Sequence, residues 1–349
     1  MVRYYTRACN FYYGKKSKIL VKNRKAFALG GNNEISFDKI EIVTRKSKKI
    51  VSLNEIRKLP ERVRSVLNKD IKEITKSRNF QKNLNFKSIP KIMGVLNITP
   101  DSFSDGGKYL NDRFAIRQMN SLFENGAHIV DIGGESTRPG SKAVSSKIEW
   151  KRLKNVLKKI KKGKLISLDT RKSDIMEKGI KLGVKLINDV SGLSFDQNTL
   201  KVLKKYNTPF VLQHSLGTPA EMQKNPKYKN VLLDIYDFFE KNIKLIKSFG
   251  IKHNNIILDP GIGFGKNLKH NMTIIKNISI YHSLGFPILL GMSRKRFIKD
   301  LSKNNDSNKR IGGTVSSTIF AMMQGVQLLR VHDVNEINQS IKVFKALLK

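Results

Sequence analysis

From Lys91 to the end of the chain, short apolar runs alternate with longer segments whose apolar positions recur at helical spacing. The runs are three to five residues long, a length that suits strands rather than helices. Polar loops separate each run from the segment that follows it. The eight predicted strands are Ile92–Leu96, His128–Ile132, Leu165–Leu168, Leu186–Val190, Pro209–Leu212, Ile256–Leu258, Pro287–Leu290 and Leu328–Val331.

The segments between these runs are amphipathic and predict helices. Strict alternation of strand and helix requires a parallel sheet, because parallel neighbours need crossover connections. Eight such units over residues 89–349 predict a (β/α)8 TIM barrel. A doubly wound open sheet shows the same alternation and is the alternative. In the last helix, Asp333 and Glu336 predict a capping box. The main helix candidates are Arg113–Phe123, Lys147–Ile160, Val231–Phe249, Thr273–Leu284 and Val334–Leu348.

Residues 1–88 form a basic N-terminal extension with a different pattern. A strand pair is predicted across Lys25–Leu29 and Glu34–Val43. A helical stretch follows over residues 53–74, which Pro60 should interrupt. No motif in the extension indicates chemistry. Its role is open: it could cover one end of the barrel, pack beside it, or be partly mobile.

Polar or charged side chains follow the predicted strands at their carboxyl ends. In a barrel these ends converge on one mouth, where the active sites of this fold lie. Hydrogen-bond acceptors after strands three, four and six suit a flat heterocycle that carries N–H donors and a carbonyl. Each aspartate alone could equally cap a helix, but three converging residues favour ring binding. These acceptors are Asp169, Asn188 and Asp259.

Cationic side chains follow strands seven and eight, where barrels commonly bind phosphate. Lys295 offers a point charge, whereas Arg330 can bind phosphate oxygens bidentately. His332 lies two residues after Arg330, so an extended strand places both on one side. Taken alone, His332 could equally be a structural histidine. The sequence therefore predicts a ring site and a phosphate site at one opening.

The loop after the first strand, within Met93–Gly107, is rich in oxygen-bearing side chains. These side chains suit Mg²⁺, which prefers oxygen ligands and is often held together with a substrate phosphate; they belong to Asn97, Thr99, Asp101, Ser102, Ser104 and Asp105. An ordinary polar strand–helix loop explains this stretch alone about as well. The glycine-rich run Gly261–Asn267 fails the P-loop pattern and is interpreted as a mobile turn that presents Phe264 to a ring.

Composition adds limits on partners and location. The formal net charge of +39 raises the question of a nucleic-acid partner. The lysine excess is spread along the chain, however, so we expect anionic small substrates and no nucleic acid. Cys9 is the only cysteine, which excludes an intrachain disulfide. No apolar run reaches the roughly 20 residues of a membrane-spanning helix, and we expect a cytoplasmic protein without membrane contact.

Seven motifs in chain order resemble dihydropteroate synthase, the folate-biosynthesis transferase, across residues 91–349. The resemblance implies a (β/α)8 barrel, usually a homodimer and a sulfonamide target. It would join 6-hydroxymethyl-7,8-dihydropterin diphosphate to p-aminobenzoate, giving 7,8-dihydropteroate and pyrophosphate with Mg²⁺. The motifs are NITPDSFSDGG (97–107), DIGGESTRPG (131–140), LDT (168–170), INDVSGL (187–193), LDPGIGFGKN (258–267), GMSRK (291–295) and RVHDV (330–334).

The same resemblance implies a role for individual motif residues, with Lys295, Arg330 and His332 as the catalytic groups. The pterin would be held by Asp169, Asn188, Asp259 and Lys295. The diphosphate and its Mg²⁺ would be held by Asn97, Arg330 and His332, with Asp105 as a further ligand. The second loop, which closes over the site in this family, would contribute Thr137, Arg138 and Pro139. The p-aminobenzoate pocket would contain Phe103, Phe264 and Ser293.

Two features fall outside the resemblance. The family often has Met-His-Met-Gln-Gly where this chain has Gln213–Gly217, which affects the wall of the pterin pocket. Residues 1–88 have no counterpart in it. A related barrel that transfers methyl groups to a corrinoid would share the acidic cradle but not need both the Arg330–His332 pair and the SRK run. A non-catalytic nucleic-acid binder would instead show salt-dependent binding through residues 1–88.

Overall fold

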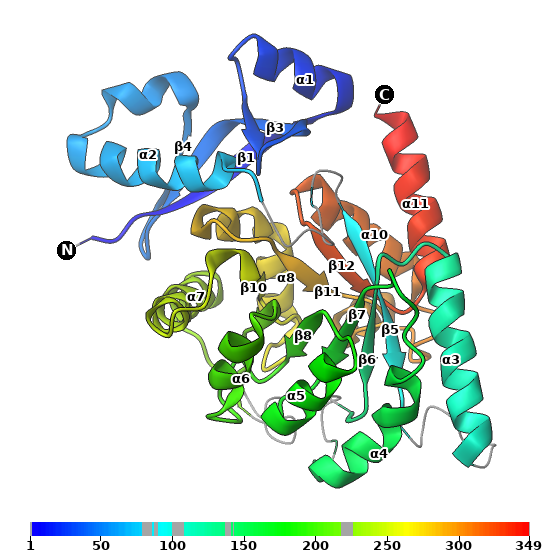
Figure 1. The fold of residues 1–349 in the computed structure, drawn as a ribbon. Coiled ribbons are helices and arrows are strands. Elements are labelled where there is room, and N and C mark those ends of the chain that lie inside the picture. Colours follow the sequence, from blue (N-terminus) through cyan, green and yellow to red (C-terminus); the bar gives the residue numbers. More distant parts are fainter. Residues whose placement is uncertain are drawn as a thin grey trace.

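The computed structural model describes residues 2–78, 86, 90–99, 108–136, 141, 143–217 and 226–348. Its largest element is a sheet of eight parallel strands in the order β10-β9-β8-β7-β6-β5-β12-β11. A parallel bridge between Leu258 and Ile288 joins the two edge strands and closes the barrel. The closed sheet confirms the (β/α)8 prediction over the doubly wound alternative (Figure 1). The strands are β5 Lys91–Asn97, β6 Ile129–Gly133, β7 Ile166–Asp169, β8 Leu186–Asp189, β9 Phe210–Gln213, β10 Ile256–Asp259, β11 Leu289–Gly291 and β12 Leu328–Val331.

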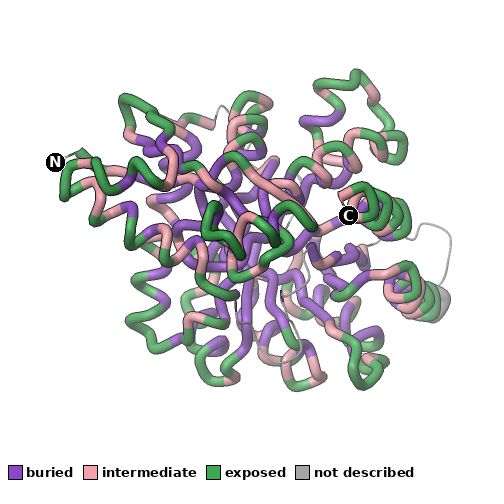
Figure 2. Tube along the Cα trace, turned by 90° about the horizontal axis from the view of Figure 1, so that it is seen from above, coloured by how far each residue is buried: buried purple, intermediate pink, exposed green. Residues whose placement is uncertain are grey.

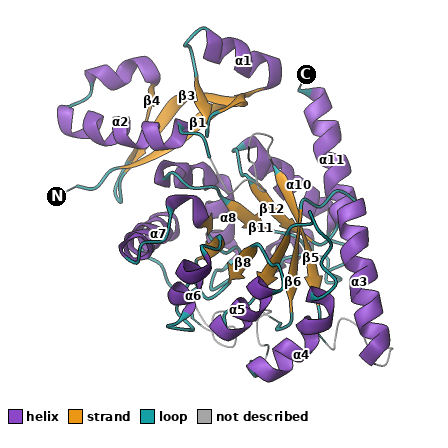
Figure 3. Ribbon diagram, viewed as in Figure 1, coloured by secondary structure: helices purple, strands orange, loops and turns teal. Residues whose placement is uncertain are grey.

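Helices surround the barrel (Figure 3). None of those described combines the length and apolar character needed to cross a membrane. The single helix predicted over Thr273–Leu284 is wrong, because the side-chain amide of Asn277 donates back to the Thr273 carbonyl at 2.8 Å where α8 ends. The helical elements are α3 Lys108–Glu124, α4 Ser146–Leu157, α5 Ser173–Lys181, α6 Thr199–Tyr206, α7 Val231–Ser248, η3 His253–Asn255, α8 Leu268–Lys276, η4 Ile278–Leu284, α9 Arg296–Ser302, α10 Ile311–Met323 and α11 Val334–Leu347.

Helix α11 begins where the sequence predicts, but its capping box is not formed. The side chain of Asp333 occupies the N-cap position without accepting a bond from the helix. Both of its carboxylate oxygens accept hydrogen bonds from the guanidinium of Arg294 instead. A charge-assisted, two-pronged pair with arginine outcompetes a cap made with a backbone amide.

The barrel interior has two layers, because alternate residues of a strand point to the same side. The lower layer is an apolar cluster that fills the barrel as a core, and Figure 2 shows that buried positions dominate the centre of the molecule. Two residues further along several of these strands, the inward positions carry polar side chains. The lower layer contains Phe86, Met93, Ile129, Leu186, Val211, Ile257, Leu289 and Leu328. The polar layer above it contains Asp131, Asn188, Gln213, Asp259 and Arg330.

The N-terminal extension is a small α+β unit with its own core. The predicted strand pair is present as β2 and β3, and the predicted break near Pro60 separates η1 from α2. Two further strands were not predicted: β1 pairs along most of β3, and β4 pairs with its second half. The elements are β1 Tyr5–Tyr13, α1 Gly14–Lys22, β2 Phe27–Leu29, β3 Asn32–Val43, β4 Lys48–Ser52, η1 Leu53–Lys58 and α2 Glu61–Thr75.

This unit packs against segments that lead into β11 and β12, at the amino ends of the barrel strands (Figure 1). The hydroxyl of Ser279 in η4 donates to the Ala8 carbonyl at 2.9 Å, and the Tyr13 hydroxyl donates to the Met323 carbonyl at 2.7 Å. Tyr5 stacks edge-on against Tyr236 of α7 at 5.1 Å. The extension therefore packs on the barrel at the end opposite the mouth.

Candidate active site

Two buried carboxylates and one amide share the mouth of the barrel with Arg330. Arg330 Nε donates to Asp131 Oδ2 at 2.6 Å, and its Nη2 donates to Asp169 Oδ2 at 2.8 Å. The amide nitrogen of Asn188 also donates to Asp131 Oδ2, at 3.0 Å. Side chains from β6, β7, β8 and β12 thus meet at one point in the barrel.

Each of the three acidic or amide side chains keeps one oxygen unused. Asp131 Oδ1, Asp169 Oδ1 and Asn188 Oδ1 are buried and meet no hydrogen-bond donor within the described part of the chain. Buried polar atoms are normally paired, since an unsatisfied acceptor costs about 1–3 kcal/mol. Three such atoms in one cluster form a cradle that a ligand with several N–H donors would satisfy.

The carboxylate partners of Arg330 were not part of the sequence prediction. The sequence assigned the acidic residues to a ring and Arg330 to phosphate, as two separate sets. In the structure the guanidinium is bound by Asp169 of the predicted ring set and by Asp131, which the sequence did not assign. Although burial opposes its charge, Asp131 and Asp169 raise the pKa of Arg330. Burial also raises the pKa of Asp169, against the influence of Arg330. Arg330 therefore links the two halves of the site.

Asp259 ends β10 and Lys295 lies on the loop after β11, at the same opening. Asp259 Oδ1 accepts the backbone N–H of Gly261 at 2.7 Å, and burial raises the pKa of this carboxylate. Lys295 Nζ lies 4.7 Å from the centre of the Phe264 ring and donates to the Ile262 carbonyl. Burial lowers the pKa of Lys295 to about 8, and Asp259 opposes the shift.

The turn that carries Phe264 is held from beneath by a buried lysine. Lys266 Nζ donates to the Phe264 carbonyl at 2.9 Å and lies 3.0 Å from His214 Nδ1. Burial lowers the pKa of Lys266 well below its usual value. Phe264 thus faces Lys295, and its contact with a substrate ring stays a prediction.

The loops after β11 and β12 make two adjacent contacts. Ser293 Oγ accepts the backbone N–H of His332 at 3.2 Å and lies 3.1 Å from His332 Nδ1. One residue further on, Arg294 forms a two-pronged ion pair with Asp333. Ser293, predicted in the p-aminobenzoate pocket, thus has His332 as its partner.

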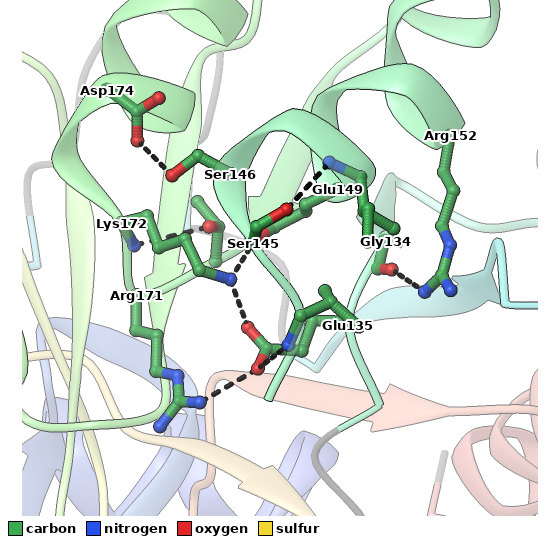
Figure 4. A network of polar contacts seen from close by, with 12 residues as sticks. Gly134, Glu135, Ser145, Ser146, Glu149, Arg152, Arg171, Lys172 and Asp174 are labelled. Carbon is green, nitrogen blue, oxygen red and sulfur yellow. Dashed lines mark hydrogen bonds and ion pairs between the residues drawn. The ribbon is translucent and has the colours of Figure 1, made fainter. Parts of the chain in front are cut away.

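A second ion-pair network joins the loops after β6 and β7 (Figure 4). Lys172 Nζ bonds both Glu135 and Glu149, and Arg171 Nη2 donates to Glu135 Oε1 at 2.8 Å. Lys172, Glu135 and Glu149 retain only 8%, 6% and 0% side-chain exposure. The network fixes the strand ends that carry Asp131 and Asp169.

Several predicted site residues lie outside the described residues: Phe103, Asp105, Thr137, Arg138 and Pro139. Asn97 is described at the end of β5, where it pairs in register with Gly133 of β6. Its amide oxygen lies 3.6 Å from the point that a Cβ on Gly133 would occupy. Within the described part of the chain, no group of three or more His, Cys, Asp or Glu side chains is placed to hold a metal.

Some site residues were not assigned from the sequence. Asp131 stands in the middle of β6 rather than at its end, and a rule based on strand ends therefore passed over it. The signal was present, because Ile129, Asp131 and Gly133 alternate on the inward face. Glu135, Lys172 and Lys266 carried no such signal, since isolated charged residues are usually solvent-exposed.

The mouth of this closed parallel barrel combines an acceptor cradle, a turn bearing an aromatic ring and two cations. Together these features define an enzyme that binds a polar heterocycle together with an anion. Comparison with protein families agrees: residues 93–332 match the model described as pterin binding enzyme. The chain belongs to the dihydropteroate synthase family of pterin-binding enzymes.

Known relatives match over most of their length. The chain is 41% identical to dihydropteroate synthase of Clostridium beijerinckii over 271 residues, covering 77% of this chain and 98% of the relative. Among solved structures, dihydropteroate synthase of Clostridium difficile, with pteroic acid, is 40% identical with a TM-score of 0.69, covering 74% and 96%. The Yersinia pestis enzyme in a sulfonamide drug complex is 38% identical with a TM-score of 0.68, covering 74% and 93%.

Proposed function

We propose that this chain joins 6-hydroxymethyl-7,8-dihydropterin diphosphate to p-aminobenzoate, giving 7,8-dihydropteroate and pyrophosphate. The observation that carries this proposal is the cradle of unpaired buried oxygens on Asp131, Asp169 and Asn188. A pterin edge presents several N–H donors side by side, which complements such acceptors. Asp259 and Lys295 extend the cradle with one further acceptor and one donor. A methyl transfer to a corrinoid would leave the cationic side of the mouth unexplained.

The cations act on the leaving group. As the bond between the exocyclic methylene carbon and the diphosphate oxygen breaks, negative charge grows on pyrophosphate. Arg330 and His332 stabilise this charge from fixed positions, so little reorganisation is needed during the reaction. The amine of p-aminobenzoate then attacks the methylene carbon, and the resulting anilinium releases its proton. The substrate and the enzyme form no covalent bond.

Mg²⁺ fits this scheme as a partner of the substrate. The ion commonly binds one or two protein oxygens together with phosphate oxygens and water, and the amide oxygen of Asn97, at the end of β5, would be one of them. When bound, Mg²⁺ would neutralise charge on the diphosphate. Asn97 and Asp105 are the two residues proposed to hold it.

The test is an assay with purified chain, pterin diphosphate, p-aminobenzoate and Mg²⁺, in which dihydropteroate and pyrophosphate are measured together. Asn188→Leu should weaken pterin binding about tenfold or more, because a buried acceptor and a donor are lost. The matched control is Asn255→Leu, which alters a buried asparagine outside the mouth. Equal pterin affinity in both variants would contradict the proposed cradle.

The expected sulfonamide sensitivity, homodimer and cytoplasmic location rest on the same proposed reaction. A sulfonamide should compete with p-aminobenzoate, as expected if the drug resembles that substrate. A homodimer is supported by helix α10, which carries the 44% exposed Phe320 as well as the partly buried Val315 and Ile319. Sedimentation velocity measures this state. A cytoplasmic location is supported by the single free thiol, Cys9.

A further inference from the structure

Ser293 makes a contact that restricts the proton of His332. The residue is 5% exposed, and its side-chain oxygen already accepts the backbone N–H of His332 at 3.2 Å. The hydroxyl proton needs an acceptor of its own. Within the described part of the chain, the only acceptor it meets is His332 Nδ1, at 3.1 Å.

The direction of this hydrogen bond decides the tautomer. If the Ser293 hydroxyl donates to Nδ1, that nitrogen carries no proton, and the neutral imidazole keeps its proton on Nε2. His332 then presents an N–H donor on the side of the ring away from Ser293. Such a donor is what an anionic leaving group requires.

A second contact holds the two loops in register. Arg294 pairs with both oxygens of Asp333, the residue after His332. Arg294 has φ +60°, a left-handed conformation that is strained for a side-chain-bearing residue. Its backbone N–H donates to Thr314 Oγ1 at 3.2 Å, and its carbonyl accepts from Arg310 Nη1 at 2.8 Å. Several contacts therefore hold this strained residue beside His332.

We propose that Ser293 and the Arg294–Asp333 pair form a two-point clamp that fixes His332 with its proton on Nε2, as a donor to the departing pyrophosphate. The inference rests on the proposed function. It makes Ser293, Arg294 and Asp333 positioning residues, which act through His332 rather than on p-aminobenzoate.

The decisive variant is Ser293→Ala, assayed for both substrates. The clamp predicts a loss of about 10–100-fold in kcat, as for other partners that orient a functional histidine, with an unchanged KM for p-aminobenzoate. Calorimetry with Mg²⁺ and inorganic pyrophosphate should show weaker binding of pyrophosphate. Ser293→Thr retains the hydroxyl and should restore both kcat and the binding of pyrophosphate. A raised KM for p-aminobenzoate with an unchanged kcat would overturn the inference and return Ser293 to the substrate pocket.

The second contact is tested by Asp333→Asn, which should reproduce the loss in kcat. Its control is Asp300→Asn, which removes an exposed pair with Arg296 on α9 and should leave kcat unchanged. Nitrogen-15 spectra of labelled histidine, assigned with a His332→Gln variant, should show the Nε2–H form in wild type and a tautomer mixture in Ser293→Ala. A wild-type Nδ1–H form would overturn the inference. Wild-type enzyme that binds neither pterin diphosphate nor pyrophosphate would instead refute the proposed function.

Discussion

The network around Lys172 gives the most direct test of what stabilises the site (Figure 4). Replacing Lys172 by Met keeps the length of the side chain but removes the charge between Glu135 and Glu149. Glu135 retains Arg171, whereas the structure gives Glu149 no other cationic partner among the described residues. Glu149 is fully buried. Removing one partner of a buried ion pair destabilises a protein by about 3–5 kcal/mol.

Urea unfolding, followed by circular dichroism, measures this change in the free energy of unfolding. The control is Lys178→Met, which removes an exposed pair with Asp174 in α5 and should cost about 0.3–0.5 kcal/mol. The double variant Lys172→Met with Glu149→Leu should recover most of the loss, because apolar replacements remove the desolvated charge as well. If Lys172→Met were no more destabilising than Lys178→Met, the argument from burial would be wrong.

Three further predictions concern the mouth. Arg330→Ala should lower kcat about 10²–10³-fold with an unchanged circular dichroism spectrum, because a preorganised cation is lost. Full activity in this variant would refute the role of Arg330 in stabilising the leaving group. Because the pKa of Lys295 is lowered to about 8, the free enzyme should lose kcat/KM for pterin diphosphate as pH rises through 8, and Lys295→Arg should remove this decline. A pterin ligand at a hundred times its Kd should stabilise the chain by about 2.7 kcal/mol in urea, and Asp169→Leu should abolish most of that gain.

The sequence predicted the barrel and its mouth well, because both follow from local pattern. Strands of three to five apolar residues and the polar residue after each one are readable along the chain. The same logic gave Asp169, Asn188, Asp259 and Lys295 their positions at one opening. Alternation along a parallel strand carries this information without knowledge of the neighbouring strands.

What the sequence could not predict depends on partners far along the chain. Strand β1 was missed because its partner, β3, lies some 30 residues away and its tyrosines and arginine obscure the alternation. Asp333 was taken as a helix cap because local pattern cannot show that Arg294, 39 residues earlier, binds it. Arg330 was assigned to phosphate alone for the same reason, since its carboxylate partners come from two other strands.

The polar layer at the mouth of the barrel and the apolar layer below it have opposite effects on the stability of the ligand-free fold. This difference explains why they are separate layers. Unsatisfied oxygens on Asp131, Asp169 and Asn188 destabilise the ligand-free fold, whereas a substrate with matching N–H donors relieves that penalty on binding. The apolar layer two residues below needs no ligand and stabilises the barrel by burial alone. The extension packs at the amino ends of the strands, which adds contacts on the side where substitutions affect stability rather than chemistry. A binding site that is poorly satisfied when empty therefore requires a core that is independent of it.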